Sequence, residues 1–525
     1  MPLALSFPAV RVAPPKDLEI RPKHVKTWIE SLPMAQSLDA ARKLSSHLAS
    51  LNRARLETDI RLQLLEVYLP PSAVALEELE AVYSKGPLPL NARGREALGL
   101  ARDLAAELAT GYKIAIVEKD SKLIAFGARK QLPLLIARAM EYLLVGLCAS
   151  YKSYTPVPPG IWRELHELYL HAEREGVARE VFDNDSKLAV FDLYTEALLL
   201  ALTDPYRLVP GEADKIRAQA RNYRGSVTLG KDRPATRSGA HFLVPCDGDR
   251  PPKPLPQIND DVGGPNWRLL DANPVVDKLR AKKQAAETGN VSATMSKSMG
   301  PDGLAFLARL ITLWGDPPKR MQQRDASQST VAICVGLKAI GHFVAHEPRM
   351  EPAAEAEALR RGITMPLTAL PTDDASQAIP VFEWDTVNQS MGGLKVRRIE
   401  AVPQPIAVGE LVGVKLMERP YWTIGVVRWL TVFDEGGMEF GIQFLGIMAR
   451  PVWVQPTIAS APQAKLGLRL ATDEGFEADA LLTPPNTYSD LREYELNDAG
   501  EVACVRADGL IEKTGRFEFF HVSPS

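Results

Sequence analysis

The hydrophobic periodicity of this chain of 525 residues changes along its length, and that change restricts the folds it can adopt. Between about residues 20 and 223, apolar side chains recur at spacings of three and four, as in Leu44, Leu48 and Leu51. That spacing predicts amphipathic helices. From Arg320 onward, short segments rich in Val, Ile, Phe and Trp are separated by turn signals, which predicts strands. A chain of this length exceeds one core, so we expect a multidomain α+β protein.

Four regions follow from this change. Residues 1–223 are expected to form an all-α helical domain, in which Pro70-Pro71 and Pro158-Pro159 separate helices. Residues 224–300 are rich in Gly, Pro and Asp, which predicts an irregular linker region or a degenerate β module, with a helix at about 274–287. Residues 301–455 are expected to hold an amphipathic helix, 302–314, and a small six-stranded antiparallel β-barrel. A Pro-rich link at 451–462 leads to a small β module at 464–525.

The strands expected in the barrel are short and apolar, with partial period-2 alternation. They are 330–335, 381–385, 393–399, 411–417, 422–429 and 439–444.

Composition excludes several classes of protein. The formal net charge is -3, so the chain has no overall positive field for nucleic acid. Cys148, Cys246, Cys334 and Cys504 lie far apart without a C-x-x-C pair. This argues against structural zinc and a disulfide framework, and it indicates a cytoplasmic protein. The N-terminal twenty residues lack the pattern of a secretion signal.

Two further patterns are discounted as sites. The most apolar helix, about 132–151, carries Arg138 and Glu141, which favours a buried helix over a membrane span. His166 and His171 are five residues apart and so face different sides of a helix, which argues against a shared metal. We expect no metal site, no cofactor and no catalytic residues.

Two short motifs in the β region carry the chemistry. One is R-x-x-x-R and the other N-x-S-x-x-G, and their residues are Arg320, Arg324, Asn388, Ser390, Gly392 and Gly393. A guanidinium fork meets guanine O6 and N7, or phosphate oxygens, with two hydrogen bonds. The Asn and Ser side chains add short polar groups, and the glycines allow positive φ and close backbone approach.

In this order, and with this strand pattern, the motifs resemble the PilZ domain, a family of cyclic di-GMP receptors. The resemblance covers about residues 320–445. It implies that Arg320 and Arg324 clamp the phosphates and guanine edges, and that Asn388, Ser390 and Gly393 hold the other side of the guanines. One departure is the spacing, because residues 346–380 resemble an insertion between the motifs that either folds over the ligand or occludes the site.

R-x-x-x-R alone has little meaning, since it recurs at Arg217/Arg221 and Arg233/Arg237. The second of these precedes a strand-like segment, 240–245, and the turn 259–264. Together, Arg233/Arg237 and this turn resemble the same pair of motifs more weakly, with Asp261 in the place of the serine.

The resulting hypothesis is a cyclic di-GMP effector that relays ligand binding through its helical domain to an unidentified protein partner. In this hypothesis the arginine loop orders on the ligand and pulls the helix 302–314 against the barrel. Two alternatives stay open. One is a PilZ fold that has lost its ligand and acts as an interaction scaffold, and the other is an enzyme with its site in the helical domain.

Overall fold

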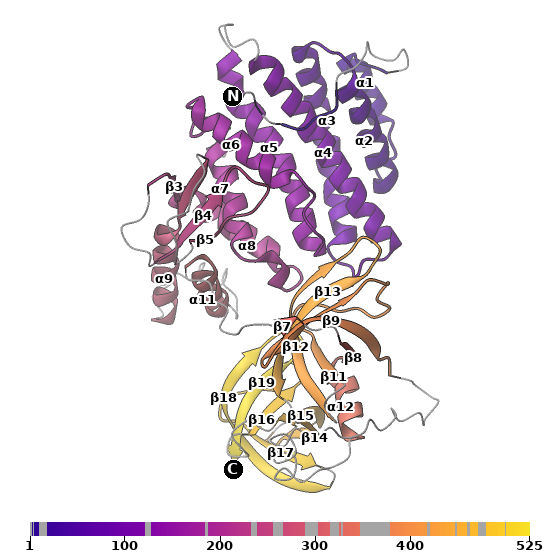
Figure 1. The fold of residues 1–525 in the computed structure, drawn as a ribbon, viewed down its shortest axis with the longest axis vertical. Coiled ribbons are helices and arrows are strands. Elements are labelled where there is room, and N and C mark those ends of the chain that lie inside the picture. The colour runs from indigo at the N-terminus through magenta and orange to yellow at the C-terminus, as the bar shows by residue number, and fades with distance from the viewer. Residues whose placement is uncertain are drawn as a thin grey trace. The chain divides into compact units, whose positions relative to one another are not determined.

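The computed structural model describes residues 3, 5–9, 18–120, 128–183, 187–232, 239–255, 266–288, 303–315, 325–326, 329–346, 379–416, 421–446, 449–458, 463–470, 479–498 and 500–525. The chain divides into two compact units (Figure 1). The first comprises Met1–Gly86 and Leu90–Lys319, and the second comprises Pro87–Pro89 and Arg320–Ser525. Helices dominate the first unit and two β-barrels form the second, which confirms the predicted fold class.

The predicted helical region forms a bundle. Its helices are α1 (Pro22–Glu30), α2 (Ser37–Arg53), α3 (Thr58–Tyr83), α4 (Ala92–Asp120), α5 (Ala128–Ser153), α6 (Ile161–Arg174), α7 (Val190–Ala201) and α8 (Glu212–Tyr223). The helices α2, α3, α4 and α5 pack side by side (Figure 1), and buried leucine and alanine side chains from all four form the core. The helix α3 continues through Pro70 and Pro71, so the predicted break there is wrong. Packing of α3 against α4 and α2 offsets the lost amide hydrogen bonds.

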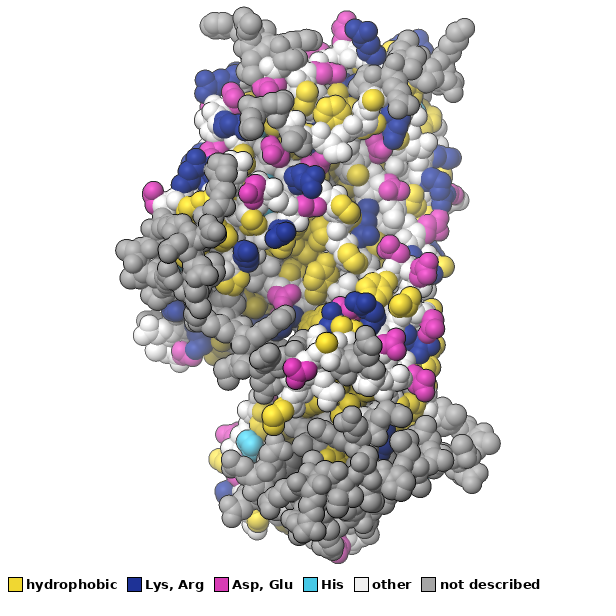
Figure 2. Space-filling model, in the orientation of Figure 1, with side chains coloured by type: hydrophobic (Ala, Val, Ile, Leu, Met, Phe, Trp, Pro, Cys, Tyr) yellow, Lys and Arg dark blue, Asp and Glu magenta, His cyan; other side chains and the backbone are white. Residues whose placement is uncertain are grey.

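Among the residues that the structure describes, one helix is long and apolar enough to cross a membrane. This is Arg129–Ser153, and 72 % of its most apolar window is buried inside the structure. Such burial is typical of the central helix of a bundle, as the sequence predicts. On the face of the first unit seen in Figure 2, acidic and basic side chains are interspersed.

The region 224–300, predicted as an irregular linker or a degenerate β module, contains a small sheet in its described residues. Its strands form an antiparallel sheet in the order β3-β6-β4-β5, with bounds β3 (Thr228–Gly230), β4 (His241–Pro245), β5 (Lys253–Pro254) and β6 (Trp267–Asp271). The two predicted helices follow as α9 (Asn273–Glu287) and α11 (Gly303–Trp314). Phe242, Val244 and Leu270 of this sheet are buried, and the sheet belongs to the first unit. The Gly and Pro content of the region gave no indication of this burial.

The predicted six-stranded barrel is confirmed. Its strands are β8 (Thr330–Val335), β9 (Phe382–Ser390), β10 (Gly393–Arg398), β11 (Leu411–Leu416), β12 (Trp422–Val432) and β13 (Met438–Gly446). They close in the order β8-β9-β10-β13-β12-β11, and the short strand β7 (Asp325–Ala326) adds to β9. Val396, Val412, Val427 and Phe440, each 0 % exposed, fill the interior.

A helix that the sequence analysis did not predict, α12 (Leu337–Ala345), follows β8. Its apolar face joins a core that both barrels share, with Ile340 beside Trp422 and Leu468. Within the expected insertion, residues 347–378 lie outside the described part of the chain. The strands on either side still pair, from Thr330↔Asp385 to Ile333↔Phe382.

The predicted C-terminal β module is a second closed barrel. Its strands are β14 (Ala449–Pro456), β15 (Lys465–Leu470), β16 (Asp479–Thr483), β17 (Glu493–Asp498), β18 (Glu501–Lys513) and β19 (Glu518–Pro524). They close in the order β14-β15-β16-β19-β18-β17, which is the strand order of the first barrel. The module therefore begins at Ala449 rather than at 464. The predicted link at 451–462 is wrong in its first half, because Val452 and Val454 point into the barrel core.

Candidate functional site

The hairpin β9–β10 carries the N-x-S-x-x-G motif. Ser390 pairs with Gly393, so Met391 and Gly392 form the turn. The Ser390 hydroxyl donates a hydrogen bond to the Gly393 carbonyl at 3.2 Å, and this side-chain bond spans the turn. Met391 is 92 % exposed at the tip. The motif thus lies at an open corner of the barrel.

A β-bulge turns Asn388 to the outside of the barrel. Thr386 pairs with Val396 and Asn388 with Lys395, so Val387 is an extra residue in β9. Thr386 and Val396 are both buried. Without the extra residue, alternation along β9 would direct Asn388 to the interior; with it, Asn388 shares the outer face with Lys395. Ser390, two residues on, shares that face.

Gly393 is required by the packing of the barrel. A Cβ at this position would lie 2.1 Å from the Ile442 carbonyl oxygen on β13. The positive φ expected for Gly393 is absent, so its role is close approach to a neighbouring strand. The wall of the barrel behind the motif is therefore held by backbone contact.

The segment that follows R-x-x-x-R reaches the hairpin. Arg320 and Arg324 lie outside the described residues, but Asp325 comes directly after Arg324. In β7, Asp325 pairs with Gln389 and Ala326 with Asn388. The residue directly after Arg324 therefore pairs with the strand that carries the N-x-S-x-x-G motif, although a long insertion separates the two motifs in sequence.

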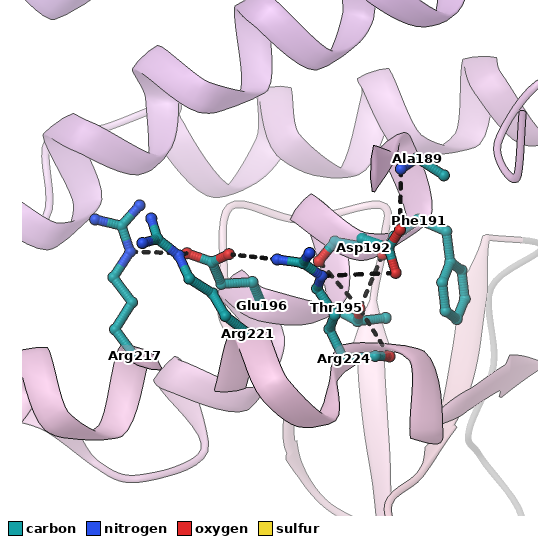
Figure 3. Close-up of polar contacts among 8 residues, drawn as sticks. All are labelled: Ala189, Phe191, Asp192, Thr195, Glu196, Arg217, Arg221 and Arg224. Carbon is teal, nitrogen blue, oxygen red and sulfur yellow. Dashed lines mark hydrogen bonds and ion pairs between the residues drawn. The ribbon is translucent and has the colours of Figure 1, made fainter. Parts of the chain in front are cut away.

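The R-x-x-x-R of α8 has a structural use. Arg217 and Arg221 each place Nε against Oε1 of Glu196 on α7, at 2.7 and 3.0 Å (Figure 3). Glu196 is 1 % exposed, and Arg224 approaches its other oxygen at 3.8 Å. A buried carboxylate held by several guanidinium groups fastens α7 to α8. The motif Arg233/Arg237 and the turn 259–264 lie outside the described residues.

The helical unit contains a small cavity of about 150 Å³. Tyr151, Lys152 and Asp214 are among its lining residues, and Lys152 Nζ lies 2.5 Å from both Asp214 and Glu80. Small-molecule sites usually enclose about 300–1,000 Å³. In the described parts of the chain, no group of three or more His, Cys, Asp or Glu residues is arranged to hold a metal ion.

Comparison with known proteins gives two family matches. The family described as "Cyclic-di-GMP receptor FimW, N-terminal domain" matches residues 23–235. "Cyclic-di-GMP receptor FimW, middle PilZ domain" matches residues 241–360 and 367–451, so this match begins at β4 and includes the whole first barrel. The Cyclic-di-GMP receptor FimW of Pseudomonas aeruginosa is 26 % identical over 494 residues, covering 83 % of this chain and 78 % of that protein. No solved structure matches the chain.

Proposed function

The middle of this chain belongs to the PilZ domain family, and from that premise we propose that the protein is a receptor for cyclic di-GMP. The observation that carries the proposal is the pairing of Asp325 and Ala326 with Gln389 and Asn388. It joins the chain beside Arg324 to the hairpin that bears Asn388 and Ser390. The relative named as a cyclic di-GMP receptor supports the same ligand.

The proposed site combines two kinds of contact. Successive residues of a strand point to opposite faces, so extending the β7 pairing by one residue in the bound state would set Arg324 opposite Ser390 on the outer face. Its guanidinium then meets a phosphate or a guanine edge with two hydrogen bonds. Asn388 and Ser390 bind the guanine from the hairpin side, and Arg320 supplies a second cation.

We propose that the segment carrying Arg320 and Arg324 also passes the signal to the helices. Trp314, at the end of α11, is 0 % exposed, and its indole N–H donates to the Leu199 carbonyl on α7 at 2.9 Å. Arg309 on the same helix contacts Glu212 on α8 at 2.7 Å. The helix thus packs within the first unit. That the ligand pulls it against the barrel stays a prediction. We propose that ligand binding by Arg320 and Arg324, on the segment between the two units, restricts the movement of the units relative to each other, a change that a protein partner reads on the helical unit.

Calorimetric titration of the full chain with cyclic di-GMP tests the proposal. The wild-type protein is expected to bind, and Arg324→Ala to bind at least roughly tenfold more weakly, because a charged hydrogen-bonded contact is lost. Arg492→Ala is the matched control, since it removes an exposed arginine from the second barrel.

Two results would contradict the proposal. No binding by a wild-type protein that unfolds cooperatively on heating would favour an interaction scaffold. Equal affinities of the wild-type and Arg324→Ala proteins would place the ligand elsewhere.

A further inference from the structure

A short segment near the start of the sequence, residues 5–9, meets a buried ion pair in the helical unit. The pair joins Lys113 on α4 to Glu164 on α6, and the ammonium lies 2.8 Å from each carboxylate oxygen. Lys113 is 5 % exposed and Glu164 is 6 % exposed. The Ser6 N–H donates to a Glu164 oxygen at 2.9 Å, and Lys113 donates to the Ser6 carbonyl at 2.6 Å. One residue of the segment thus supplies both a donor and an acceptor to the pair.

The ion pair binds the backbone of the segment rather than a side chain. Ser6 is itself exposed, while Leu5, Phe7 and Pro8 on either side of it are half-buried. In an extended chain the N–H and C=O of one residue point to the same side, which is how a strand meets its neighbour. Here the ion pair takes the place of that neighbour. The contact therefore tolerates any central residue that has a backbone N–H, and it excludes proline.

The ion pair depends on an occupant. A buried pair of charges is stable only when further hydrogen bonds satisfy the remaining protons and lone pairs. Without the Ser6 peptide groups, a proton of Lys113 and a lone pair of Glu164 would lose their hydrogen bonds. Within the described part of the chain, no other hydrogen bond involves residues 5–9. The segment is therefore held by hydrogen bonds at one residue, and a segment of the same chemistry can replace it.

We propose that Lys113 and Glu164 form a peptide-binding site of the helical unit, which residues 5–9 occupy and which a partner protein enters by displacing them. The chemistry of the occupant identifies that of the partner. It presents an extended segment with apolar residues on both sides of a central residue whose N–H and C=O are free to bond. A site that is open for only a fraction of the time binds with its affinity reduced by that fraction, so the chain's own segment sets a threshold for the partner. The inference goes beyond the proposed function and does not depend on the nucleotide.

Binding of a fluorescently labelled peptide with the sequence of residues 3–9 to the full chain tests this. Ser6→Pro removes the N–H that bonds to Glu164, so the chain's own segment should leave the site. The peptide should then bind at least roughly tenfold more tightly than it binds the wild-type protein. Ser6→Ala is the matched control, because it changes only an exposed side chain and should behave like the wild type. A labelled peptide with proline in place of Ser6 should bind none of these proteins.

A further variant locates the site. Lys113→Met and Glu164→Met, added together to the Ser6→Pro chain, replace the buried pair with apolar side chains of similar volume, an exchange that folds usually tolerate. This variant should unfold cooperatively on heating and should not bind the peptide.

Three results would overturn the inference: no binding to the Ser6→Pro protein, equal binding to Ser6→Ala and Ser6→Pro, or binding retained by a folded methionine variant. Cyclic di-GMP affinity should be the same in all of these proteins. Failure of the peptide site therefore leaves the receptor proposal standing, and a protein that does not bind cyclic di-GMP can still bind the peptide.

Discussion

At the scale of single residues, the motif glycine and the bulge decide the shape of the candidate site. Gly393→Ala would place a methyl group 2.1 Å from the Ile442 carbonyl, so β10 and β13 must separate. We expect the variant to lose about 1–3 kcal/mol of barrel stability and to bind cyclic di-GMP more weakly. Calorimetric unfolding and titration measure the two effects. Gly509→Ala, in a strand position where an added Cβ meets nothing within 4 Å, is the control, and equal effects of both changes would contradict the argument.

The residue types of the site could be predicted from sequence, but their orientation could not. The motifs identify Asn388, Ser390 and Gly393 because short polar groups beside a glycine suit a tight turn. The extra residue Val387, which turns Asn388 outward, leaves no mark in the sequence.

At the scale of elements, the strands of the first barrel follow their hydrophobic pattern closely, because each buries one face. Two elements that the sequence did not predict, α12 and β14, depend on contacts between distant parts of the chain. The helix α12 is short and depends on a core shared with the second barrel, and β14 contains prolines that the closed barrel accommodates. In both cases tertiary contacts outweigh the local signal.

His166 joins three elements, and its protonation should destabilise the helical unit. Its Nε2 lies 2.9 Å from the Arg250 carbonyl, so that nitrogen donates, and Nδ1 accepts from the Tyr194 hydroxyl at 2.7 Å. Burial lowers the pKa of His166 from 6.5 to about 4. Between these values the unfolded chain binds more protons than the folded one, so stability falls as the pH drops from 6.5 to 4, by about 2–4 kcal/mol from this group.

Denaturant unfolding at pH 6.5 and pH 4 measures this effect. In His166→Gln the acid-induced loss should be smaller than in the wild-type protein, because the amide keeps a donor and an acceptor without titrating. His521→Gln, an exposed position on the second barrel, should behave like the wild type. The same acid-induced loss in all three proteins would show that His166 is not responsible.

At the scale of the whole molecule, the two barrels share one strand order but only the first carries the ligand motifs. In the second unit they are joined by a shared core and by Arg428, whose guanidinium meets both oxygens of Glu512 at 2.5 and 2.7 Å. The second barrel therefore supports the β12 side of the first. The segment 316–324, which carries Arg320 and Arg324, connects Trp314, bonded to α7, with Asp325, paired with β9.

Lengthening that segment should separate binding from response. An insertion of Gly and Ser residues after Pro318, as long as the segment 316–324 itself, doubles the connection while leaving Arg320 and Arg324 next to β7. Doubling a flexible loop costs only about 0.6 kcal/mol, so affinity for cyclic di-GMP should fall by no more than roughly threefold. The distribution of distances between a spin label on the helical unit and one on the barrel should become narrower when the wild-type protein binds the ligand. In the insertion variant this distribution should stay broad, because the ligand-bound segment with Arg320 and Arg324 no longer constrains α11. The Arg324→Ala variant should show no narrowing, since it does not hold the ligand. Equal narrowing in the wild-type and insertion proteins would mean that the signal does not pass through this segment.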